Sequence, residues 1–410
     1  MAGVRCRFVT LLPVRIFTVG GNRHPESYEP WWPVQRLSHL SRCGLPLTTP
    51  RTPPGARSMA GRIHFVGPAK YRIRSAQAMA RSILEVSARR MCKGPKRPTW
   101  TWFVEVCTEM LKRQVAAAFE MEDLNEARRY LDSISLGSPA LTEVNIAPVT
   151  EEKFHGSWFT ARDAPSSITL LYLHGGGYSF YPRAYASFIA MITRAARCRT
   201  FALDYRLSPE HRFPAQLDDA LNAYRWLLNS NVDPSNLVFA GDSAGGNLTL
   251  ALLLAARDAN LPLPALAVAL SPPIDFDTEY PSMLANPHND WISLRALRQW
   301  ADWFCEPAQR RNPLVSPVLA DLRGLPPIYL QAGRAELLYD SIQLFVEHAR
   351  AQGADVVFDT WEDMNHDFQI FGSDAPQSSA ALRKIGDVIN ARLAASPATE
   401  VVSARDRQPA

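Results

Sequence analysis

The chain has 410 residues, of which 47% are hydrophobic and 20% are charged, and its formal net charge is +4. This composition fits a globular protein with an ample core, and no apolar run approaches the roughly 18 residues of a membrane-spanning helix. Six scattered cysteines show neither a metal-binding nor a disulfide pattern, so reduced thiols in a cytoplasmic protein are expected.

The start of the chain differs from the rest in charge, because residues 1–98 contain 18 Lys or Arg against 3 Asp or Glu. Residues 1–58 are rich in proline and arginine, show no helix or strand period, and are predicted to be disordered, as is the tail 397–410. An over-long start before Met59, a targeting leader and a basic tail are the open interpretations, and we favour the first. Pro13 and Arg15 interrupt the apolar stretch 8–19, which argues against a secretory signal.

Residues 59–135 begin with basic runs, including Lys70–Arg74 and Arg89–Lys93. A solvated face or a linker is the commoner structure for such runs, and weak contact with an anionic membrane surface is the alternative. The stretch Trp100–Phe119 follows, with aromatic and aliphatic residues close to helical spacing, and it predicts an amphipathic helix.

A glycine-rich turn follows the next buried-strand pattern. The apolar run Ile168–Leu173 leads into His174-Gly175-Gly176-Gly177. Three consecutive glycines let backbone N–H groups point into a cavity with no side chain in the way. We expect the amides of Gly175 and Gly176 to stabilise an oxyanion, with His174 orienting the loop.

The second motif is a serine turn between a predicted strand and a predicted helix. The strand Leu237–Ala240 precedes Gly241-Asp242-Ser243-Ala244-Gly245, and a Leu- and Ala-rich helix runs from Asn247 to Arg257. A serine in this context lies on a strained turn that presents its Oγ at the top of a sheet. Ser243 is therefore the predicted nucleophile, and the Ala244 amide the third oxyanion donor.

A serine nucleophile needs a base, which in this arrangement comes last in the chain, after an acid. Of three downstream histidines, His288 and His348 fall in a polar turn and a helix, whereas His366 falls on a late loop after the strand-like segment 355–361. His366 is the predicted base. Glu336, just after the predicted strand Pro327–Ala332, is the predicted acid, and Asp340 is the alternative.

Strand and helix patterns alternate from Ser166 onward, which predicts an α/β fold with a mostly parallel sheet and covering helices. The sequence contains no C-x-x-C, no H-E-x-x-H and no dinucleotide-binding G-x-G-x-x-G, so neither a metal nor an organic cofactor is expected. Nothing in the sequence points to nucleic acid as a partner, and the oligomeric state is not predicted.

In these motifs the chain resembles the hormone-sensitive lipase-like esterases of the α/β-hydrolase superfamily, from about Ser166 to Leu393. Further matching segments are Asp204–His211, Phe213–Ala215 and Met364–Phe368. Two departures are Glu336 where the family usually has Asp, and Ser208 in a segment that usually has Ala. The resemblance implies a triad of Ser243, Glu336 and His366.

The resemblance also implies a helical cap over the active site. Residues 59–135 would supply its first part and an insertion at about 275–312 its second, with the catalytic domain spanning 136–396. Trp300 and Trp303 in the insertion are candidate walls of the substrate pocket, with ordinary cap packing as the alternative. Tyr178 is a further candidate for the pocket. The implied substrates are short- to medium-chain esters.

Two other functions remain open at this stage. An acyltransferase, or an amide or lactone hydrolase, could use the same triad, because the chemistry is shared up to the acyl-enzyme. A non-catalytic ligand-binding member of the fold would be favoured by the loss of the base, but His366 is present.

Overall fold

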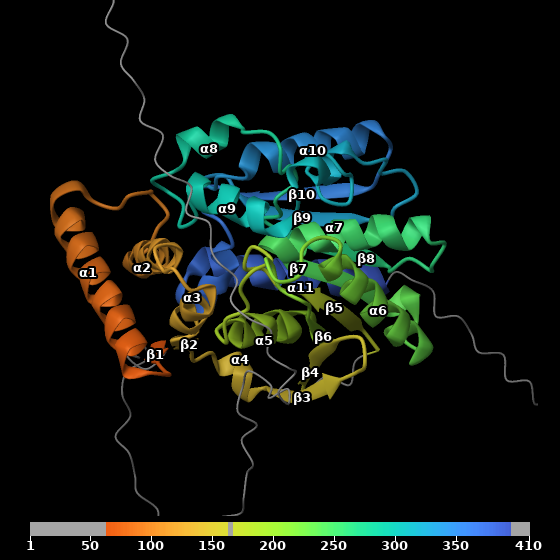
Figure 1. Ribbon diagram of the computed structural model, residues 1–410, viewed down its shortest axis with the longest axis horizontal. Coiled ribbons are helices and arrows are strands. Elements are labelled where there is room, and N and C mark those ends of the chain that lie inside the picture. Colours follow the sequence, from red (N-terminus) through yellow and green to blue (C-terminus); the bar gives the residue numbers. More distant parts are fainter. Residues whose placement is uncertain (1–62, 163–166, 395–410) are drawn as a thin grey trace, which may run out of the picture.

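The computed structural model describes residues 63–162 and 167–394 (Figure 1). The predictions for residues 1–58 and 397–410 concern segments outside these ranges. Within them, no helix is both long and apolar enough to cross a bilayer.

An eight-stranded sheet forms the centre of the molecule, in the order β10-β9-β8-β7-β5-β6-β4-β3. Its strands are β3 (Val144–Thr150), β4 (His155–Ala161), β5 (Thr169–Leu173), β6 (Arg199–Asp204), β7 (Leu237–Asp242), β8 (Leu266–Leu270), β9 (Ile328–Gly333) and β10 (Val356–Trp361). Strand β4 runs antiparallel to β3 and β6, and all the other pairs are parallel. The mostly parallel sheet confirms the predicted fold class, and β5, β7, β9 and β10 form where the sequence indicates.

Helices cover both faces of this sheet. They are α4 (Pro139–Thr142), α5 (Tyr185–Ala196), α6 (Ala215–Asn229), α7 (Ser243–Asp258), α10 (Tyr339–Ala351) and α11 (Pro376–Ala394). Alternate strand residues point to opposite faces, so Leu171 packs in a core with α6, α7 and α10, whereas Leu170 packs in a core with α5 and α11. Burial on both faces explains why β5 and β7 read as continuous apolar runs.

The N-terminal elements form a separate helical layer at one side of the sheet (Figure 1). They are β1 (Ile63–Phe65), α1 (Ala69–Lys93), α2 (Trp102–Phe119), α3 (Leu124–Leu131) and β2 (Ile134–Leu136). Strands β1 and β2 pair antiparallel and close this layer at its base. The predicted amphipathic helix is α2, whose Val104, Val106 and Met110 are buried.

The insertion between β8 and β9 carries α8 (Pro281–Ala285) and α9 (Leu294–Phe304), and short 3-10 turns complete the chain. Phe119 of α2 stacks on Trp303 of α9, with ring centroids 5.5 Å apart. Lys112 Nζ donates to the Pro287 carbonyl at 2.6 Å. Because these contacts join α2 to the insertion, the N-terminal helical layer and the insertion pack together as one helical unit, which is called the cap below. The cap is tied to the sheet domain by the Arg128–Glu210 ion pair at 2.7 Å.

Candidate active site

Ser243 lies on the sharp turn between β7 and α7. Its φ is +48°, in the left-handed region, where a non-glycine residue costs about 1–3 kcal/mol. A Cβ on Gly241 would lie 2.3 Å from the Gly245 carbonyl oxygen, and one on Gly245 would lie 1.9 Å from the Leu173 carbonyl oxygen. Close backbone approach therefore requires both glycines, and the turn holds Ser243 at the carboxyl edge of the sheet.

His366 comes from the loop after β10 and reaches this serine. Its Nε2 lies 2.9 Å from the Ser243 Oγ. Its backbone is held by Trp291, whose Nε1 donates to the His366 carbonyl at 2.7 Å. Burial lowers the pKa of His366 to about 3, so the imidazole is neutral at pH 7 and can accept a proton.

Glu336 follows β9 and is fully buried beside the site. Its Oε2 accepts hydrogen bonds from the Ser271 Oγ at 2.7 Å and the Gly333 amide at 3.3 Å. Its Oε1 and the His366 Nδ1 are both buried without a hydrogen-bond partner among the described residues. Burial raises the pKa of Glu336 well above its usual value, and the bond from Ser271 opposes this. Glu336, the predicted acid, is therefore hydrogen-bonded to Ser271 and not to His366.

Asp340, the alternative acid, lies in the first turn of α10 and faces the cap. Its Oδ2 accepts from the Ser282 amide of α8 at 2.7 Å. This hydrogen bond fixes the position of α8, so the Asp340 carboxylate contacts the cap rather than the imidazole of His366.

Asp290, in the cap insertion, connects three parts of the site. Its carboxylate accepts from the amides of Trp291 at 2.8 Å, Leu337 at 2.8 Å and His366 at 3.3 Å. Burial raises the pKa of Asp290 to about 7, while these amide bonds act in the opposite direction. The cap insertion therefore helps to fix the loop that carries His366.

His174 fixes the glycine loop rather than acting as a base. Its ring is stacked between Tyr181 and Tyr205, with centroid distances of 3.7 and 4.0 Å. Its Nδ1 lies 2.7 Å from the Gly175 carbonyl oxygen, and burial lowers its pKa to about 3. A neutral, sandwiched imidazole sets the direction of the three glycines that follow.

The three glycines do not have equivalent environments. The Gly175 amide donates to the Asp242 Oδ1 at 3.1 Å, so it is engaged inside the protein, which differs from the sequence-based expectation. Gly176 and Gly177 line the cavity in front of Ser243. Ala244 is the second residue of α7, where a backbone N–H has no partner within the helix.

Asp242 holds this loop in place through hydrogen bonds. Besides the Gly175 amide, its carboxylate accepts from the hydroxyls of Tyr172 at 2.5 Å and Tyr185 at 2.8 Å. Burial raises its pKa, and the three hydrogen bonds oppose that rise. Asp242 thus joins the serine turn to the glycine loop.

Asp367 places a second carboxyl group next to the imidazole. It adopts φ +47°, and its Oδ2 lies 3.2 Å from the His366 Nε2. Its Oδ1 is buried with no hydrogen-bond partner in the described residues, and its side chain lines the cavity. Burial, followed by the charges of Asp242, Glu336 and Asp290, raises the pKa of Asp367 well above its usual value.

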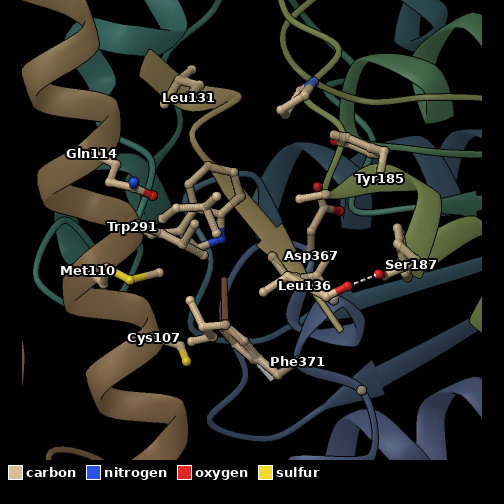
Figure 2. A pocket seen from close by; sticks show the side chains of 18 of the residues that line it. Cys107, Met110, Gln114, Leu131, Leu136, Tyr185, Ser187, Trp291, Asp367 and Phe371 are labelled. Atoms are coloured by element: carbon tan, nitrogen blue, oxygen red, sulfur yellow. Dashed lines mark hydrogen bonds between the residues drawn. The ribbon is translucent and has the colours of Figure 1, made fainter. Parts of the chain in front are cut away.

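A cavity of about 200 Å³ opens in front of Ser243. Its walls come from α2, the β2 region, α5, the cap insertion and the loop after His366, and most of the lining side chains are apolar. Figure 2 shows Cys107, Met110 and Gln114 of α2 along one wall, with Phe371 and Ser187 on other parts of the lining. A dry cavity of about 150 Å³ is enough to bind benzene, so this one fits a small apolar substrate group.

One of the three predicted pocket residues lines this cavity. Trp300 does so, packed so closely over Gly177 that a Cβ there would lie 2.4 Å from the indole. Tyr178 instead is buried in the core, where its hydroxyl donates to the Asn247 Oδ1 at 2.5 Å and its ring stacks on Phe304. Trp303 stacks on Phe119 inside the cap. Neither residue lines the cavity, and the contacts of Trp303 are those of the alternative, ordinary cap packing.

Comparisons with known proteins agree with this geometry. A family model described as "alpha/beta hydrolase fold" matches residues 170–370. An acetyl-hydrolase from Streptomyces hygroscopicus is 38% identical over 53% of this chain and 74% of its own length. An esterase from Acinetobacter venetianus is 29% identical over 64% of this chain and 88% of its own length.

Solved structures that resemble this chain are also esterases. A crystal structure of an esterase from the bacterial hormone-sensitive lipase family superposes with a TM-score of 0.67 at 33% identity, covering 72% of this chain and 99% of that one. The chain belongs to this family of α/β-hydrolases. Its relatives place it among carboxylesterase-type hydrolases.

Within this hydrolase, sequence reasoning overlooked two buried carboxyl groups beside the base. Asp367 directly follows His366 in the chain, and its position after the predicted base was the available signal. Asp290 stands in a polar turn of the insertion, and no local pattern distinguishes it from a solvated aspartate. In the residues described, no cluster of three His, Cys, Asp or Glu could hold a metal ion.

Proposed function

We propose that the protein hydrolyses short- to medium-chain carboxylic esters through an acyl-enzyme on Ser243. The observation that carries this proposal is the 2.9 Å contact between the Ser243 Oγ and the His366 Nε2 at the edge of an apolar cavity. A serine hydroxyl is a weak nucleophile, and a neutral imidazole at this distance can take its proton as it attacks.

In the first half-reaction the Ser243 Oγ bonds to the ester carbonyl carbon, and its proton moves to the His366 Nε2. The negative charge that forms on the carbonyl oxygen faces backbone donors, for which we propose the amides of Gly176, Gly177 and Ala244. Each such donor typically contributes about 10²–10³ in rate. Collapse of the tetrahedral intermediate breaks the bond to the alcohol oxygen, which leaves with the proton from His366.

In the second half-reaction a water molecule gives its proton to His366 and attacks the acyl carbon. Collapse of this second intermediate breaks the bond to the Ser243 Oγ, which regains a proton and releases the acid. We propose that Glu336 orients the imidazole through the Nδ1. The Glu336 Oε1 and the His366 Nδ1 are both buried without a hydrogen-bond partner among the described residues, as is the Asp367 Oδ1, and a hydrogen bond between the first two would satisfy both.

The size and character of the cavity support small apolar esters as substrates. Its lining is mostly apolar, and its volume is near that of a single small ring or a short chain. The names of relatives point the same way, since an ethyl acetate hydrolase from Pseudomonas putida is 30% identical over 75% of its own length.

The test is hydrolysis of p-nitrophenyl esters from acetate to palmitate by the wild-type protein and by Ser243→Ala. Labelling with a fluorophosphonate, followed by intact mass, reports the nucleophile. Turnover with an optimum at short or medium chains, lost together with labelling in the variant, is the expected result. A folded protein that shows neither turnover nor labelling would overturn the catalytic assignment. Labelling without hydrolysis would redirect the assignment to transfer onto another acceptor.

A further inference from the structure

Helix α1 has an apolar stripe on the face that points away from α2 and the rest of the cap. Ile73, Leu84 and Met91 are exposed to 57%, 70% and 82%, and Ala80 between them is exposed as well. At about 100° per residue, these four positions point within about 40° of one another. Three of the six large hydrophobic residues with high exposure in the described ranges therefore lie on one line along one helix.

The opposite face of α1 is the one that packs against the rest of the protein. Tyr71, Ser75, Met79, Ser82 and Val86 are buried against the rest of the cap. Figure 1 shows α1 as the outermost element at this side of the molecule, with α2 between it and the sheet. The stripe is therefore a second apolar face, which the fold of the described residues does not cover.

Basic residues flank this stripe. Helix α1 contains seven, Lys70, Arg72, Arg74, Arg81, Arg89, Arg90 and Lys93, against a single acidic residue, Glu85. Some are engaged within the cap: Lys70 pairs with Glu126, and Arg89 and Arg90 pair with Glu105. Arg72 and Arg81 project from the two sides of the stripe and are exposed, and neither has an ion pair with another described residue.

We propose that the outer face of α1 docks on an anionic lipid surface. An apolar stripe with Lys and Arg beside it is the pattern of a helix that lies in the plane of a membrane interface. Basic residues near such a surface are attracted to its negative charge, and the buried apolar side chains add to this attraction. The charge argues against a second copy of this chain, because two such helices would bring their basic flanks together.

Docking in this orientation brings the cavity close to the lipid. The inner face of α1 packs on α2, and Phe103, Cys107, Met110 and Leu111 of α2 line the cavity in front of Ser243. Helix α1 would contact the membrane, and α2, which packs against it, forms part of the cavity wall. The proposal concerns the location of the enzyme and does not depend on which ester it hydrolyses.

Vesicle sedimentation with the full-length protein tests the proposal. We expect binding to vesicles of phosphatidylcholine mixed with phosphatidylglycerol, weaker binding to phosphatidylcholine alone, and a loss of binding as salt is raised. Leu84→Gln combined with Met91→Gln should lower the partition coefficient about tenfold or more, as should Arg72→Gln combined with Arg81→Gln.

Two control variants match these changes elsewhere. Leu284→Gln alters a leucine of α8 that is also 70% exposed, and Arg225→Gln alters an exposed arginine of α6. Neither should change vesicle binding. None of the altered residues lines the cavity, so hydrolysis of a soluble short ester should be equal in all these variants and reports correct folding.

A fluorescent probe on Cys92 separates docking of α1 from binding by the basic residues that precede it. Cys92 is exposed on α1, whereas Cys107, Cys198 and Cys305 are buried, so a polarity-sensitive dye can be attached there after Cys6→Ser and Cys43→Ser. Its emission should shift to the blue on addition of anionic vesicles. An unchanged emission, or stripe variants that bind vesicles like the wild type, would overturn the proposal. So would a concentration-dependent dimer lost in the stripe variants, or a lowered melting temperature without any change in vesicle binding.

Discussion

The two halves of the candidate site are built by different means. On the nucleophile side, Gly241 and Gly245 fix the turn by close backbone contact, and each oxygen of Asp242 accepts at least one hydrogen bond. On the base side, the Glu336 Oε1, the His366 Nδ1 and the Asp367 Oδ1 are buried without hydrogen-bond partners in the described residues.

This difference separates a rigid half from an adjustable one. Buried polar atoms without partners cost about 1–3 kcal/mol each, so they favour any small movement that pairs them. The backbone of the serine turn has no comparable freedom. We infer that the nucleophile is positioned in advance, whereas the base and its acid complete their hydrogen bonds when a substrate or a small side-chain rotation allows it.

The largest expected effect comes from removing the imidazole. His366→Ala should lower kcat by about 10⁶, because loss of the base in a serine hydrolase costs as much as loss of the whole triad. Fluorophosphonate labelling should fall with it. The measurement is steady-state hydrolysis of a p-nitrophenyl ester, with circular dichroism to show that the fold is retained. A folded variant that kept more than a small fraction of the activity would assign the base to another group.

Replacing the acid tests whether the unpaired Glu336 completes the triad. Glu336→Gln keeps the size of the side chain but cannot hold the productive tautomer, and kcat should fall by about 10⁴. Asp340→Asn is the control, since Asp340 bonds to Ser282 in the cap, and its effect should stay within a few-fold. If Asp340→Asn lowered kcat more than Glu336→Gln, Asp340 would be the acid of the triad.

Adding one methyl group tests the rigid half. Gly245→Ala would place a carbon 1.9 Å from the Leu173 carbonyl oxygen, so the turn must shift, and a displacement of about 1 Å can cost about 10² in rate. The free energy of unfolding should also fall by about 1–3 kcal/mol, measured by urea denaturation.

Gly246→Ala provides the comparison at the next position. Its closest contact would be 3.1 Å, to a side-chain carbon of Pro272, so a shift of a few tenths of an ångström suffices and both losses should be smaller. Equal losses in the two variants would show that the turn is less constrained than its contacts indicate.

The sequence predicted the rigid half better than the adjustable one, for a physical reason. Glycines at Gly241, Gly245 and Gly176 are imposed by backbone geometry, which leaves a local pattern in the sequence. The order of strand, serine and helix likewise leaves a local pattern in the sequence. Such features can be recognised without knowing what packs against them.

Contacts made by side chains from distant segments leave no such pattern. Asp290 reaches the His366 loop from the cap insertion, and the engagement of the Gly175 amide depends on the rotamer of Asp242. Tyr178 follows the glycine loop directly, but its ring turns into the core and stacks on Phe304. These outcomes are decided by tertiary packing, so the sequence alone could suggest the region but not the partner.

The smallest expected effect concerns the carboxyl group next to the base. Asp367→Asn keeps the shape and tolerates the positive φ of this position. Asp367 lies 3.2 Å from the His366 Nε2, but its pKa is raised well above the usual value, while burial lowers the pKa of His366 to about 3. Asp367 is therefore in its neutral acid form when the imidazole titrates. Because neutral Asp367 carries no charge to remove, Asp367→Asn should leave the acid limb of the pH profile, which reports the His366 imidazole, where it is.

We expect the acid limb to move by less than about half a pH unit, and kcat/KM near neutral pH to change by less than about tenfold. The profile of kcat/KM reports the free enzyme, in which the contact is present. Asp218→Asn, at an exposed position of α6, makes the same chemical change away from the site and should leave the profile as it is. An acid limb that moves to lower pH in Asp367→Asn would mean that Asp367 is ionised while His366 titrates and that it favours the protonated imidazole. In that case burial and the charges of Asp242, Glu336 and Asp290, which raise the pKa of Asp367, would be too weak to keep it neutral in the working range.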